Sequence, residues 1–408
     1  MKFDTLEKKI GDKSAAVAFV GLGKMGLPTA LLIADAGFRV TGIDVNEKVV
    51  EACNECKSPY LEPGLDDYLE KNKSRFKATL DYSAVKEADV VLCAVPTIID
   101  SKRHTDFSIV EKAFSQIGMH LKRGSLVVFE SNVTPGITET LVKSSLEKQS
   151  GMKCGVDFLL AYVPIQGKAG QMFDDLKKYE RVVSGMDAQA RGAADLLFRK
   201  IGNKTILASS IKVVELEKLF ANIYKDINIA IANELDAYCR MEGIESKEVI
   251  AHVNKIPGIK LFLPDIGVGG NCLPVDPYFY VDDAKSKGME IRLAALARKI
   301  NDERPALFAR KIIALAKKKG TDKVCLLGMA FRPNTHETAY SPAIEVYKLV
   351  KKELPQTAAF DPLVGAERMR ALGIDAVSES QLAAYPLKVR LARHDAFKGL
   401  DCVDALGL

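Results

Sequence analysis

The segment that most constrains the fold lies near the N-terminus, between residues 15 and 45. It reads AAVAFVGLGKMGLPTALLIADAGFRVTGIDV: a short apolar run, a glycine-rich turn, small and apolar residues at helical spacing, and a second apolar run. Two neighbouring strands that are joined through a helix lie parallel in one sheet. The segment therefore predicts a βαβ unit at the start of an α/β domain.

The glycine turn of this unit has the pattern of a dinucleotide site. Gly21, Gly23 and Gly26 permit a tight turn, close approach to a pyrophosphate and close packing of helix on strand, and the helix N-terminus attracts phosphate. Asp44 ends the next strand, where a carboxylate accepts hydrogen bonds from a ribose and repels a 2′-phosphate. A purely structural turn is the alternative, but the full context favours a site for NAD rather than NADP.

Further apolar runs, at residues 90–95, 125–130 and 157–163, alternate with helical patterns and predict more strands of a parallel, doubly wound sheet. The stretch 211–242 contains neither glycine nor proline and predicts one long helix, which is typical of a spine between domains or a subunit contact. After Pro305, strand-like segments return and predict a second, smaller α/β domain. They are KVCLLGMAF (323–331), TAAFDP (357–362) and LKVRLARH (387–394).

The chain has 408 residues, of which 48% are hydrophobic, so it can form several domains with large cores. We expect an α/β protein with two doubly wound Rossmann-like domains joined by a long central helix. The predicted division is a Rossmann domain at 1–205, a central helical domain at 206–305 and a Rossmann-like domain at 306–408.

Composition excludes several classes of protein. The formal net charge of +5 is spread along the chain and gives no reason to expect nucleic acid. Eight irregularly spaced cysteines fit a reducing compartment, and no apolar run reaches the roughly 18–20 residues that cross a bilayer. The first residues lack the apolar region of a signal peptide, while Phe3, Leu6 and Ile10 predict a short packed helix. We therefore expect a soluble, cytoplasmic protein.

A second chemical motif is GVGGNCLPVDPYF, at residues 267–279. Glycines surround Cys272 and leave its sulfur approachable, and Asp276 follows close enough to share one pocket. The segment has neither helical nor strand periodicity, which is unusual for a cysteine that fills a core. The residues alone leave both readings open, a nucleophile or a buried structural thiol.

Lys218 and Asn222 lie one turn apart on the long helix and so share a face. Together they could stabilise an oxyanion, although a solvated helix face explains the same pair. Cys53 and Cys56 form a CxxC pair on a predicted helix without the second pair of a zinc site. The histidines do not cluster with acidic residues, so no metal is predicted.

The motifs occur in one order along the chain: GLGKMG, YLEPGL (60–65), VPT (95–97), ESNVTPG (130–136), ELEKLFANIYKDINIAIANE (215–234), GVGGNCLPVDPYF and GMAFRPNTHETAYSP (328–342). In this order they resemble the UDP-glucose/GDP-mannose dehydrogenase family from about residue 15 to the C-terminus. The resemblance implies a two-step, four-electron oxidation of a sugar C6 hydroxyl to a carboxylate on a UDP-sugar, with NAD as cofactor. It also implies a homodimer through the long helix and a C-terminal domain that binds the UDP-sugar.

Site residues follow from the same resemblance. Cys272 would attack the intermediate aldehyde and carry a thiohemiacetal and then a thioester, which water hydrolyses. Lys218 and Asn222 match the pair that holds the oxyanion and the water, and Asp276 matches the carboxylate that assists proton transfer. Implied cofactor contacts are Gly21, Gly23, Lys24, Met25, Gly26, Asp44, Val95, Pro96, Thr97 and Asn132. Implied substrate contacts are Lys260, Gly269, Gly270, Phe331 and Arg332.

The cysteine segment also bears on the sugar. Val268, Leu273, Val275 and the extension 277–279 resemble the branch that makes N-acetylhexosaminuronates more than the branch that oxidises UDP-glucose. This favours UDP-N-acetylmannosamine or an epimer as substrate, with a UDP-glucose 6-dehydrogenase as the alternative.

The chain departs from the family pattern at several positions. After Pro164 it continues directly with Ile165, so the glutamate to which the family's water activation is assigned is absent. Either a loop is missing from the sequence, which the retained neighbouring motifs favour, or thioester hydrolysis is lost. A non-catalytic homologue that binds nucleotide sugars is therefore a further alternative. Asn132, Asn271, Arg332 and Ala339 also replace residues that are common in the family.

Overall fold

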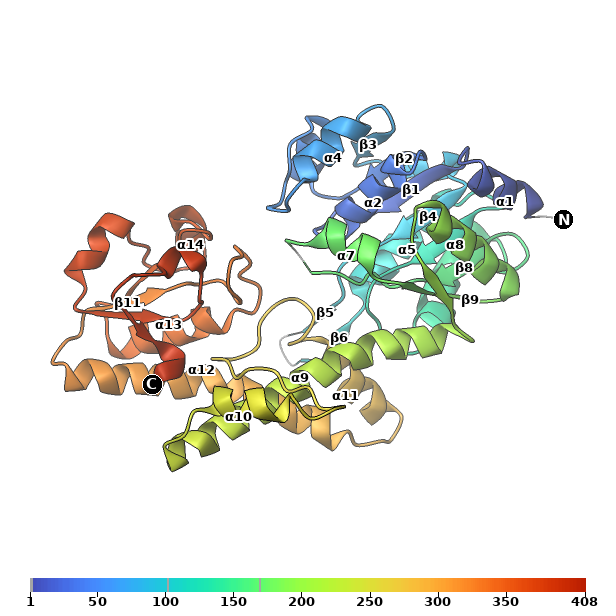
Figure 1. Cartoon of the computed structure of the whole chain (residues 1–408). Coiled ribbons are helices and arrows are strands. Elements are labelled where there is room, and N and C mark those ends of the chain that lie inside the picture. Colours follow the sequence, from blue (N-terminus) through green and yellow to red (C-terminus); the bar gives the residue numbers. More distant parts are fainter. Residues whose placement is uncertain (1–2, 101–102, 169) are drawn as a thin grey trace. The chain divides into compact units, whose positions relative to one another are not determined.

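The computed structural model describes residues 3–100, 103–168 and 170–408. The chain forms two compact units, residues 1–219 and 220–408, and each unit contains its own sheet of mostly parallel strands (Figure 1). Among the described residues, no helix combines the length and the apolarity that a membrane span requires.

The first unit is built on an eight-stranded sheet with the order β10-β9-β8-β7-β4-β1-β2-β3. All neighbours are parallel except β8 and β9. The strands are β1 (Ala16–Val20), β2 (Arg39–Ile43), β3 (Phe76–Thr79), β4 (Val90–Cys93), β7 (Leu126–Phe129), β8 (Leu159–Tyr162), β9 (Arg181–Gly185) and β10 (Thr205–Leu207). The series from β3 to β8 reproduces the Rossmann strand order and confirms the doubly wound sheet that the apolar runs predict.

Helices cover both faces of this sheet, which explains why β4, β7 and β8 are buried at every position. One apolar cluster includes residues of α1, α2 and α8, and the other includes residues of α5 and α6. The helices are α1 (Asp4–Gly11), α2 (Gly26–Asp35), α3 (Glu47–Asn54), α4 (Leu65–Asn72), α5 (Ser108–His120), α6 (Lys143–Ser150), α7 (Met172–Lys178) and α8 (Ala188–Lys200). The remaining elements are the hairpin β5 (Ile98–Ile99) and β6 (Thr105–Asp106), the 3₁₀ turn η1 (Tyr82–Glu87) and the π-helical turn η2 (Thr138–Val142).

The short helix predicted at the N-terminus is present as α1 and packs against α8. Phe3, Leu6 and Ile10 are buried, as their helical spacing predicts.

The long helix α9 (Ile211–Glu242) has the bounds that the sequence predicts. It begins in the first unit and continues into the second. No glycine or proline interrupts it, so the backbone ladder extends through its whole length.

The second unit continues with helices and then forms a four-stranded parallel sheet with the order β12-β11-β13-β14. Its helices are α10 (Ser246–Val253), α11 (Asp276–Ser286), α12 (Arg292–Lys318), α13 (Pro342–Glu353) and α14 (Ala366–Ala371). Its strands are β11 (Val324–Leu327), β12 (Ala358–Phe360), β13 (Leu387–Arg390) and β14 (Val403–Asp404), and its 3₁₀ turns are η3 (Glu379–Ala384), η4 (Asp395–Phe397) and η5 (Ala405–Gly407). Strands alternate with helices here too, which confirms the second Rossmann-like sheet.

The predicted boundary at residue 305 does not coincide with the end of an element. Pro305 lies inside α12, a helix of 27 residues. A proline removes one backbone donor but does not end a helix when packing holds both sides. Its ring lies against the backbone at Gly267, where an added Cβ would be 3.2 Å from Cγ of Pro305. The division into three domains stays a prediction, and its boundary at 305 falls within this helix.

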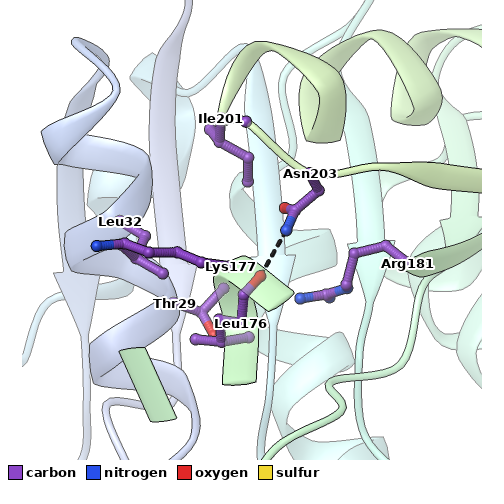
Figure 2. Close-up of a pocket in the computed structure, with 8 residues that line it drawn as sticks. Thr29, Leu32, Leu176, Lys177, Arg181, Ile201 and Asn203 are labelled. Carbon is purple, nitrogen blue, oxygen red and sulfur yellow. Dashed lines mark hydrogen bonds between the residues drawn. The ribbon is translucent and has the colours of Figure 1, made fainter. Parts of the chain in front are cut away.

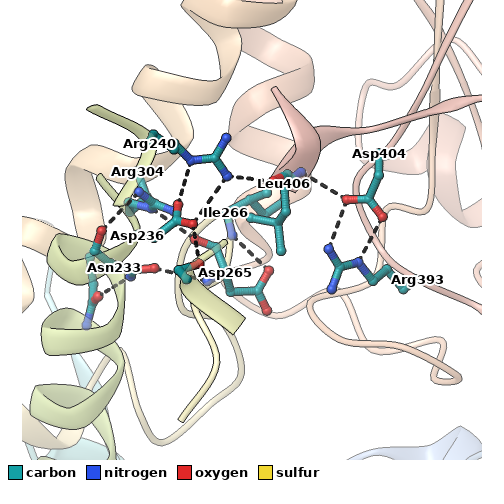
Figure 3. A network of polar contacts seen from close by, with 11 residues as sticks. Asn233, Asp236, Arg240, Asp265, Ile266, Arg304, Arg393, Asp404 and Leu406 are labelled. Carbon is teal, nitrogen blue, oxygen red and sulfur yellow. Dashed lines mark hydrogen bonds and ion pairs between the residues drawn. The ribbon is translucent and has the colours of Figure 1, made fainter. Parts of the chain in front are cut away.

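A polar network holds the second unit together (Figure 3). On α9, Asp236 accepts hydrogen bonds from Nε of Arg240 at 2.9 Å and from Nη2 of Arg304, on α12, at 3.2 Å. Arg240 also donates to the backbone carbonyl of Leu406, which follows the last strand. These charged groups tie two helices to the C-terminal end of the chain.

Candidate functional site

The three glycines of the first turn, Gly21, Gly23 and Gly26, differ in the space that a side chain would have. Gly21 has φ +93°, and a Cβ there would lie 2.7 Å from the carbonyl oxygen of Ala94. A Cβ at Gly26 would lie 2.0 Å from the carbonyl oxygen of Gly21, so α2 packs on the strand only because that position is glycine. Gly23 has nothing within 4 Å of an added Cβ. The turn is therefore closed on two sides and open at Gly23, as the binding of a pyrophosphate requires.

Asp44 follows β2 beside this turn. Its Oδ2 accepts the backbone N–H of Leu22 at 2.7 Å, and its Oδ1 accepts that of Asn46 at 2.9 Å. Tyr60 also holds the turn, because its hydroxyl donates to the carbonyl of Leu22 at 3.0 Å. The carboxylate is half-buried and fixed, and it keeps acceptor capacity for ribose hydroxyls. These residues fit NAD.

Two more predicted cofactor segments end neighbouring strands. Val95, Pro96 and Thr97 follow β4, and Asn132 follows β7. Oγ of Ser131 donates to the carbonyl of Val95 at 2.6 Å, which ties the two segments together. Because β7, β4 and β1 are adjacent, both segments lie at the same sheet edge as the glycine turn.

The remaining predicted cofactor residues, Lys24 and Met25, are half-buried at the start of α2. All ten predicted cofactor residues thus lie at one edge of the sheet.

Glu62, in the YLEPGL motif, has a structural role that its local sequence does not reveal. The buried carboxylate of Glu62 accepts the backbone N–H groups of Gly170 and Met172, the latter at 2.7 Å. It therefore caps α7 from a position more than a hundred residues earlier in the chain. The only sequence signal was an acidic residue in a proline- and glycine-containing turn.

Ile165 occupies the place after β8 where the resemblance expects a glutamate. Its side chain is 5% exposed and packs with Met172, Leu176 and the partly buried Met25. An apolar side chain that points into this cluster supplies no proton acceptor.

Next to this segment lies a buried ion pair that the sequence did not predict. Arg181 donates to a carboxylate oxygen of Glu130, and both side chains are almost fully buried. Arg181 also donates to the carbonyl of Val163 at 3.2 Å, and the N–H of Ile165 donates to the carbonyl of Glu130 at 3.2 Å. Burial raises the pKa of Glu130, and the charge of Arg181 opposes this rise. The pair fixes the backbone where β7 and β8 end.

A cavity of about 30 Å³ lies beside Arg181, between α2, α7 and the end of α8 (Figure 2). Across this cavity, Nδ2 of Asn203 donates a hydrogen bond to the carbonyl of Leu176 at 2.6 Å. This volume holds about one water molecule and is far too small for a nucleotide. The cavity is lined by Thr29, Leu32, Leu176, Lys177, Arg181, Ile201, Gly202 and Asn203.

In the second unit, Cys272 lies in the turn that leads into α11. Its carbonyl accepts the N–H groups of Val275 at 3.0 Å and Asp276 at 2.8 Å. Among the eight cysteines Cys272 is the exposed one, whereas the others are buried or half-buried. Because Cys272 is exposed, it is not a structural residue of the core.

Asn222 and Asp276 form a buried pair between α9 and α11. Nδ2 of Asn222 donates to Oδ2 of Asp276 at 2.6 Å, and the residues are 5% and 2% exposed. Asp276 is the first residue of α11, and the backbone bond from its N–H to the carbonyl of Cys272 joins the two predicted residues. Lys218 is half-buried one helical turn before Asn222.

The predicted substrate residues Gly269, Gly270 and Phe331 are in contact. A Cβ at Gly269 would lie 2.5 Å from Cβ of Phe331, and one at Gly270 would lie 3.3 Å from its ring. The N–H of Gly270 also donates to the carbonyl of Ala339 at 2.8 Å. The glycines are needed here because the segment that contains Phe331 lies directly on the cysteine segment.

Arg332 is half-buried, with its guanidinium 5.5 Å from the ring centre of Phe331. Lys260 is exposed in the segment before the glycines. Its carbonyl accepts Nδ2 of Asn228, on α9, at 2.7 Å, and Oδ1 of Asn228 accepts the N–H of Phe262 at 2.6 Å. The backbone around Lys260 is thereby fixed to the long helix.

The CxxC pair is not a pair on one helix, as the sequence suggested. Cys53 is buried on α3, but Cys56 lies beyond its end with φ 56°. Burial raises the pKa of Cys53 to about 12, so this thiol stays protonated at neutral pH. Within the described ranges, no group of three or more His, Cys, Asp or Glu side chains could hold a metal ion.

Comparisons with known proteins agree with this geometry. Models of the UDP-glucose/GDP-mannose dehydrogenase family match residues 15–202 (NAD binding domain), 212–303 (central domain) and 325–407 (UDP binding domain). The chain is 32% identical to the UDP-N-acetyl-D-mannosamine dehydrogenase of Pyrococcus horikoshii, over 85% of this chain and 84% of that protein. It is 30% identical to the NDP-N-acetyl-D-galactosaminuronic acid dehydrogenase of Ralstonia nicotianae, over 97% of this chain and 95% of that protein.

Solved structures show the same similarity. The UDP-D-ManNAc dehydrogenase of Pyrococcus horikoshii has a TM-score of 0.87 at 29% identity, over 95% of this chain and 91% of that one. The UDP-glucose dehydrogenase of Pyrobaculum islandicum has a TM-score of 0.87 at 26% identity, over 96% of this chain and 94% of that one. The chain therefore belongs to the UDP-glucose/GDP-mannose dehydrogenase family and is an NAD-dependent nucleotide-sugar dehydrogenase.

Proposed function

We propose that this enzyme oxidises C6 of a UDP-N-acetylhexosamine, UDP-N-acetylmannosamine or an epimer, to the uronate through a covalent bond to Cys272. The observation that carries the proposal is the exposed residue Cys272 in the turn before α11, next to the buried Asn222–Asp276 pair. The names of the relatives from Pyrococcus horikoshii and Ralstonia nicotianae support an N-acetylated amino sugar as the substrate.

The proposed chemistry gives a task to each of the four predicted catalytic residues, Cys272, Lys218, Asn222 and Asp276. Sγ of Cys272 bonds to the carbon of the C6 aldehyde, and the ammonium of Lys218 and the amide of Asn222 stabilise the oxyanion that forms. When bound, one NAD would accept the hydride of the first oxidation, and a second NAD would accept the hydride of the second. Asp276, held by Asn222, accepts the proton of the attacking thiol and returns one when water cleaves the thioester. The covalent bond keeps the aldehyde in the site between the two oxidations.

The presence of Ile165 in place of the family's glutamate leads us to expect slow hydrolysis of the thioester. No carboxylate stands in the place of the family's glutamate, so water attacks the thioester with less assistance. We expect thioester hydrolysis to limit the rate, with a rapid release of two NADH per site followed by slow turnover. A nucleotide-sugar-binding homologue without catalysis is the second candidate that Ile165 favours.

The long helix supports a homodimer. Large exposed apolar side chains lie along α9 in two series with seven-residue spacing, Val213 and Phe220 in one and Tyr224, Ile231 and Tyr238 in the other. Such a stripe packs against another helix of the same kind, and a second copy of this chain supplies one through a two-fold axis. We propose that the dimer forms there, in a cytoplasmic enzyme that supplies uronates for polysaccharide synthesis.

The direct test is the yield of NADH in the first turnover with UDP-N-acetylmannosamine, UDP-N-acetylgalactosamine and UDP-glucose. We expect two NADH per site with one of the N-acetylated sugars and little with UDP-glucose. A preference for UDP-glucose would contradict the proposed substrate. NAD and UDP-sugar binding without any NADH would establish the non-catalytic alternative.

A further inference from the structure

The segment that carries Phe331 and Arg332 has no regular secondary structure, yet it is held firmly. It follows β11, and the N–H of Phe331 donates to the carbonyl of Glu337 at 2.9 Å, which closes a loop between them. Glu337 is 3% exposed. We call residues 329–337 the β11 loop. Because Phe331 lies on the cysteine segment, the conformation of this loop matters for the proposed substrate site.

One end of the β11 loop is bound by Asp361, which follows β12. Oδ2 of Asp361 accepts the N–H groups of Met329 at 2.6 Å and Ala330 at 3.2 Å. Its Oδ1 accepts the N–H groups of Leu363 at 2.9 Å and Val364 at 3.0 Å. Burial alone would raise the pKa of Asp361, but hydrogen bonds from His394 and these backbone groups hold the pKa below its usual range.

The middle of the β11 loop is bound by His394, whose side chain is fully buried. Nε2 of His394 lies 3.1 Å from Oδ2 of Asp361, and Nδ1 accepts the backbone N–H of Asn334 at 2.8 Å. An imidazole nitrogen that accepts an N–H carries no proton, so the ring proton is on Nε2 and is donated to Asp361. Both ring nitrogens are thus used, one toward Asp361, which binds the start of the loop, and one toward Asn334 in its middle.

Asn334 also binds a second segment of the chain, through its side chain. Its φ is 54°, in the left-handed region that an asparagine tolerates better than most residues. Its Nδ2 donates to Oδ2 of Asp395 at 2.7 Å, and its Oδ1 accepts the N–H of Asp395 at 2.8 Å. The side chain and the backbone of Asn334 therefore both bind the segment that begins η4.

We propose that His394 and Asp361 are positioning residues for the nucleotide end of the substrate. They set the conformation in which the β11 loop presents Phe331 and Arg332. The inference rests on the proposed role of Phe331 and Arg332 as substrate contacts. The bond at Nδ1 holds the loop directly through Asn334, whereas the bond at Nε2 reaches Asp361, whose carboxylate four backbone N–H groups also bind.

Two replacements of His394 separate the two ring functions. His394→Asn keeps an acceptor near the position of Nδ1, while His394→Gln keeps a donor near the position of Nε2 and loses the acceptor for Asn334. We expect the Gln variant to bind UDP about tenfold more weakly, with an increased KM for the UDP-sugar, and the Asn variant to bind UDP within about threefold of wild type. The affinity for NAD and the kcat should not change in either variant.

The probe is UDP alone, measured by calorimetry on the full chain with the melting temperature as a control. Wild-type UDP affinity in the Gln variant would overturn the inference. Equal loss of UDP and NAD affinity with a lower melting temperature would also overturn it, since that result indicates a merely structural role. If wild type itself did not bind UDP, the proposed substrate contacts would fail instead.

A second variant keeps the test valid if neither His394 variant folds. Asn334→Gly retains the positive φ and the N–H that His394 accepts but removes both bonds to the exposed Asp395. We expect about a threefold loss of UDP affinity at an unchanged melting temperature. Unchanged UDP affinity in this variant would contradict the inference.

Discussion

Among single residues, Glu130 and Arg181 illustrate how the first unit holds the edge of its sheet where the predicted cofactor residues lie. The two side chains are 0% and 1% exposed, and each keeps one polar atom, Oε2 and Nε, without a hydrogen-bond partner in the protein. A buried charge of this kind is tolerated because its partner is adjacent. The pair therefore stabilises the fold only as long as both charges are present.

Removing one partner of the Glu130–Arg181 pair should lower the free energy of unfolding by an amount that depends on pH. Arg181→Met leaves the Glu130 carboxylate unpaired and should lower the free energy of unfolding by about 3–5 kcal/mol at neutral pH. Loss of Arg181 raises the pKa of Glu130 further, so the folded variant retains a proton that the unfolded chain releases above its ordinary value of 4.5. Burial already raises the pKa of Glu130 in the wild type to about 7, so the deficit of the variant relative to the wild type should grow as the pH rises above about 7 and shrink below it.

Urea unfolding at about pH 5 and about pH 8 measures this difference. Lys57→Met is the control, because the Lys57–Glu55 pair is exposed and should contribute little. A deficit of the same size at both pH values would contradict the assignment of the effect to Glu130.

The candidate site was predictable from the sequence where neighbours along the chain carry the signal. Gly21, Gly23 and Asp44 lie close in sequence, and Cys272 precedes Asp276 by a single turn. Glu62 and Arg181 escaped prediction because their partners are distant in the sequence, at Met172 and Glu130. No local pattern distinguishes such a residue from a solvated one.

At the scale of elements, the strand–turn–helix unit of β1 and α2 assigns different tasks to its glycines. Gly23→Ala places a methyl group in open space, so the protein should keep its melting temperature while its KM for NAD rises tenfold or more, about 1.4 kcal/mol. Gly26→Ala places a methyl group against the carbonyl of Gly21 and should lower both stability and NAD affinity.

Thermal unfolding and NAD titration of Gly23→Ala and Gly26→Ala test these expectations for stability and for NAD binding. Equal loss of stability in both would show that Gly23 also serves packing. Unchanged NAD affinity in Gly23→Ala would place the cofactor away from this turn.

The long helix α9, which has a strong local pattern, was predicted with its observed bounds. The extent of α12 depends instead on packing. The bounds of α9 agree with the glycine- and proline-free stretch. Pro305 did not mark the end of an element: α12 continues through it, and its ring packs near Gly267, a contact that the local sequence does not show.

At the scale of the whole molecule, the apolar stripe of α9 should determine the oligomeric state. Ile231→Glu places a charge in the middle of the stripe and should convert the proposed dimer into a monomer, measured by light scattering during size-exclusion chromatography. Ala237→Glu is the matched control, because Ala237 is exposed on α9 away from the stripe. A monomeric wild type, or a dimeric Ile231→Glu variant, would contradict an interface at this face.

The central claim is that Cys272 carries the substrate as a thioester. The most direct measurement is mass spectrometry of the intact protein, quenched in acid within the first turnover with UDP-N-acetylmannosamine and NAD, followed by peptide mapping. We expect an added mass equal to the UDP-sugar acyl group on the peptide that contains Cys272, and no addition in Cys272→Ala. Uronate production by Cys272→Ala at the wild-type rate, with no adduct in the wild type, would contradict it.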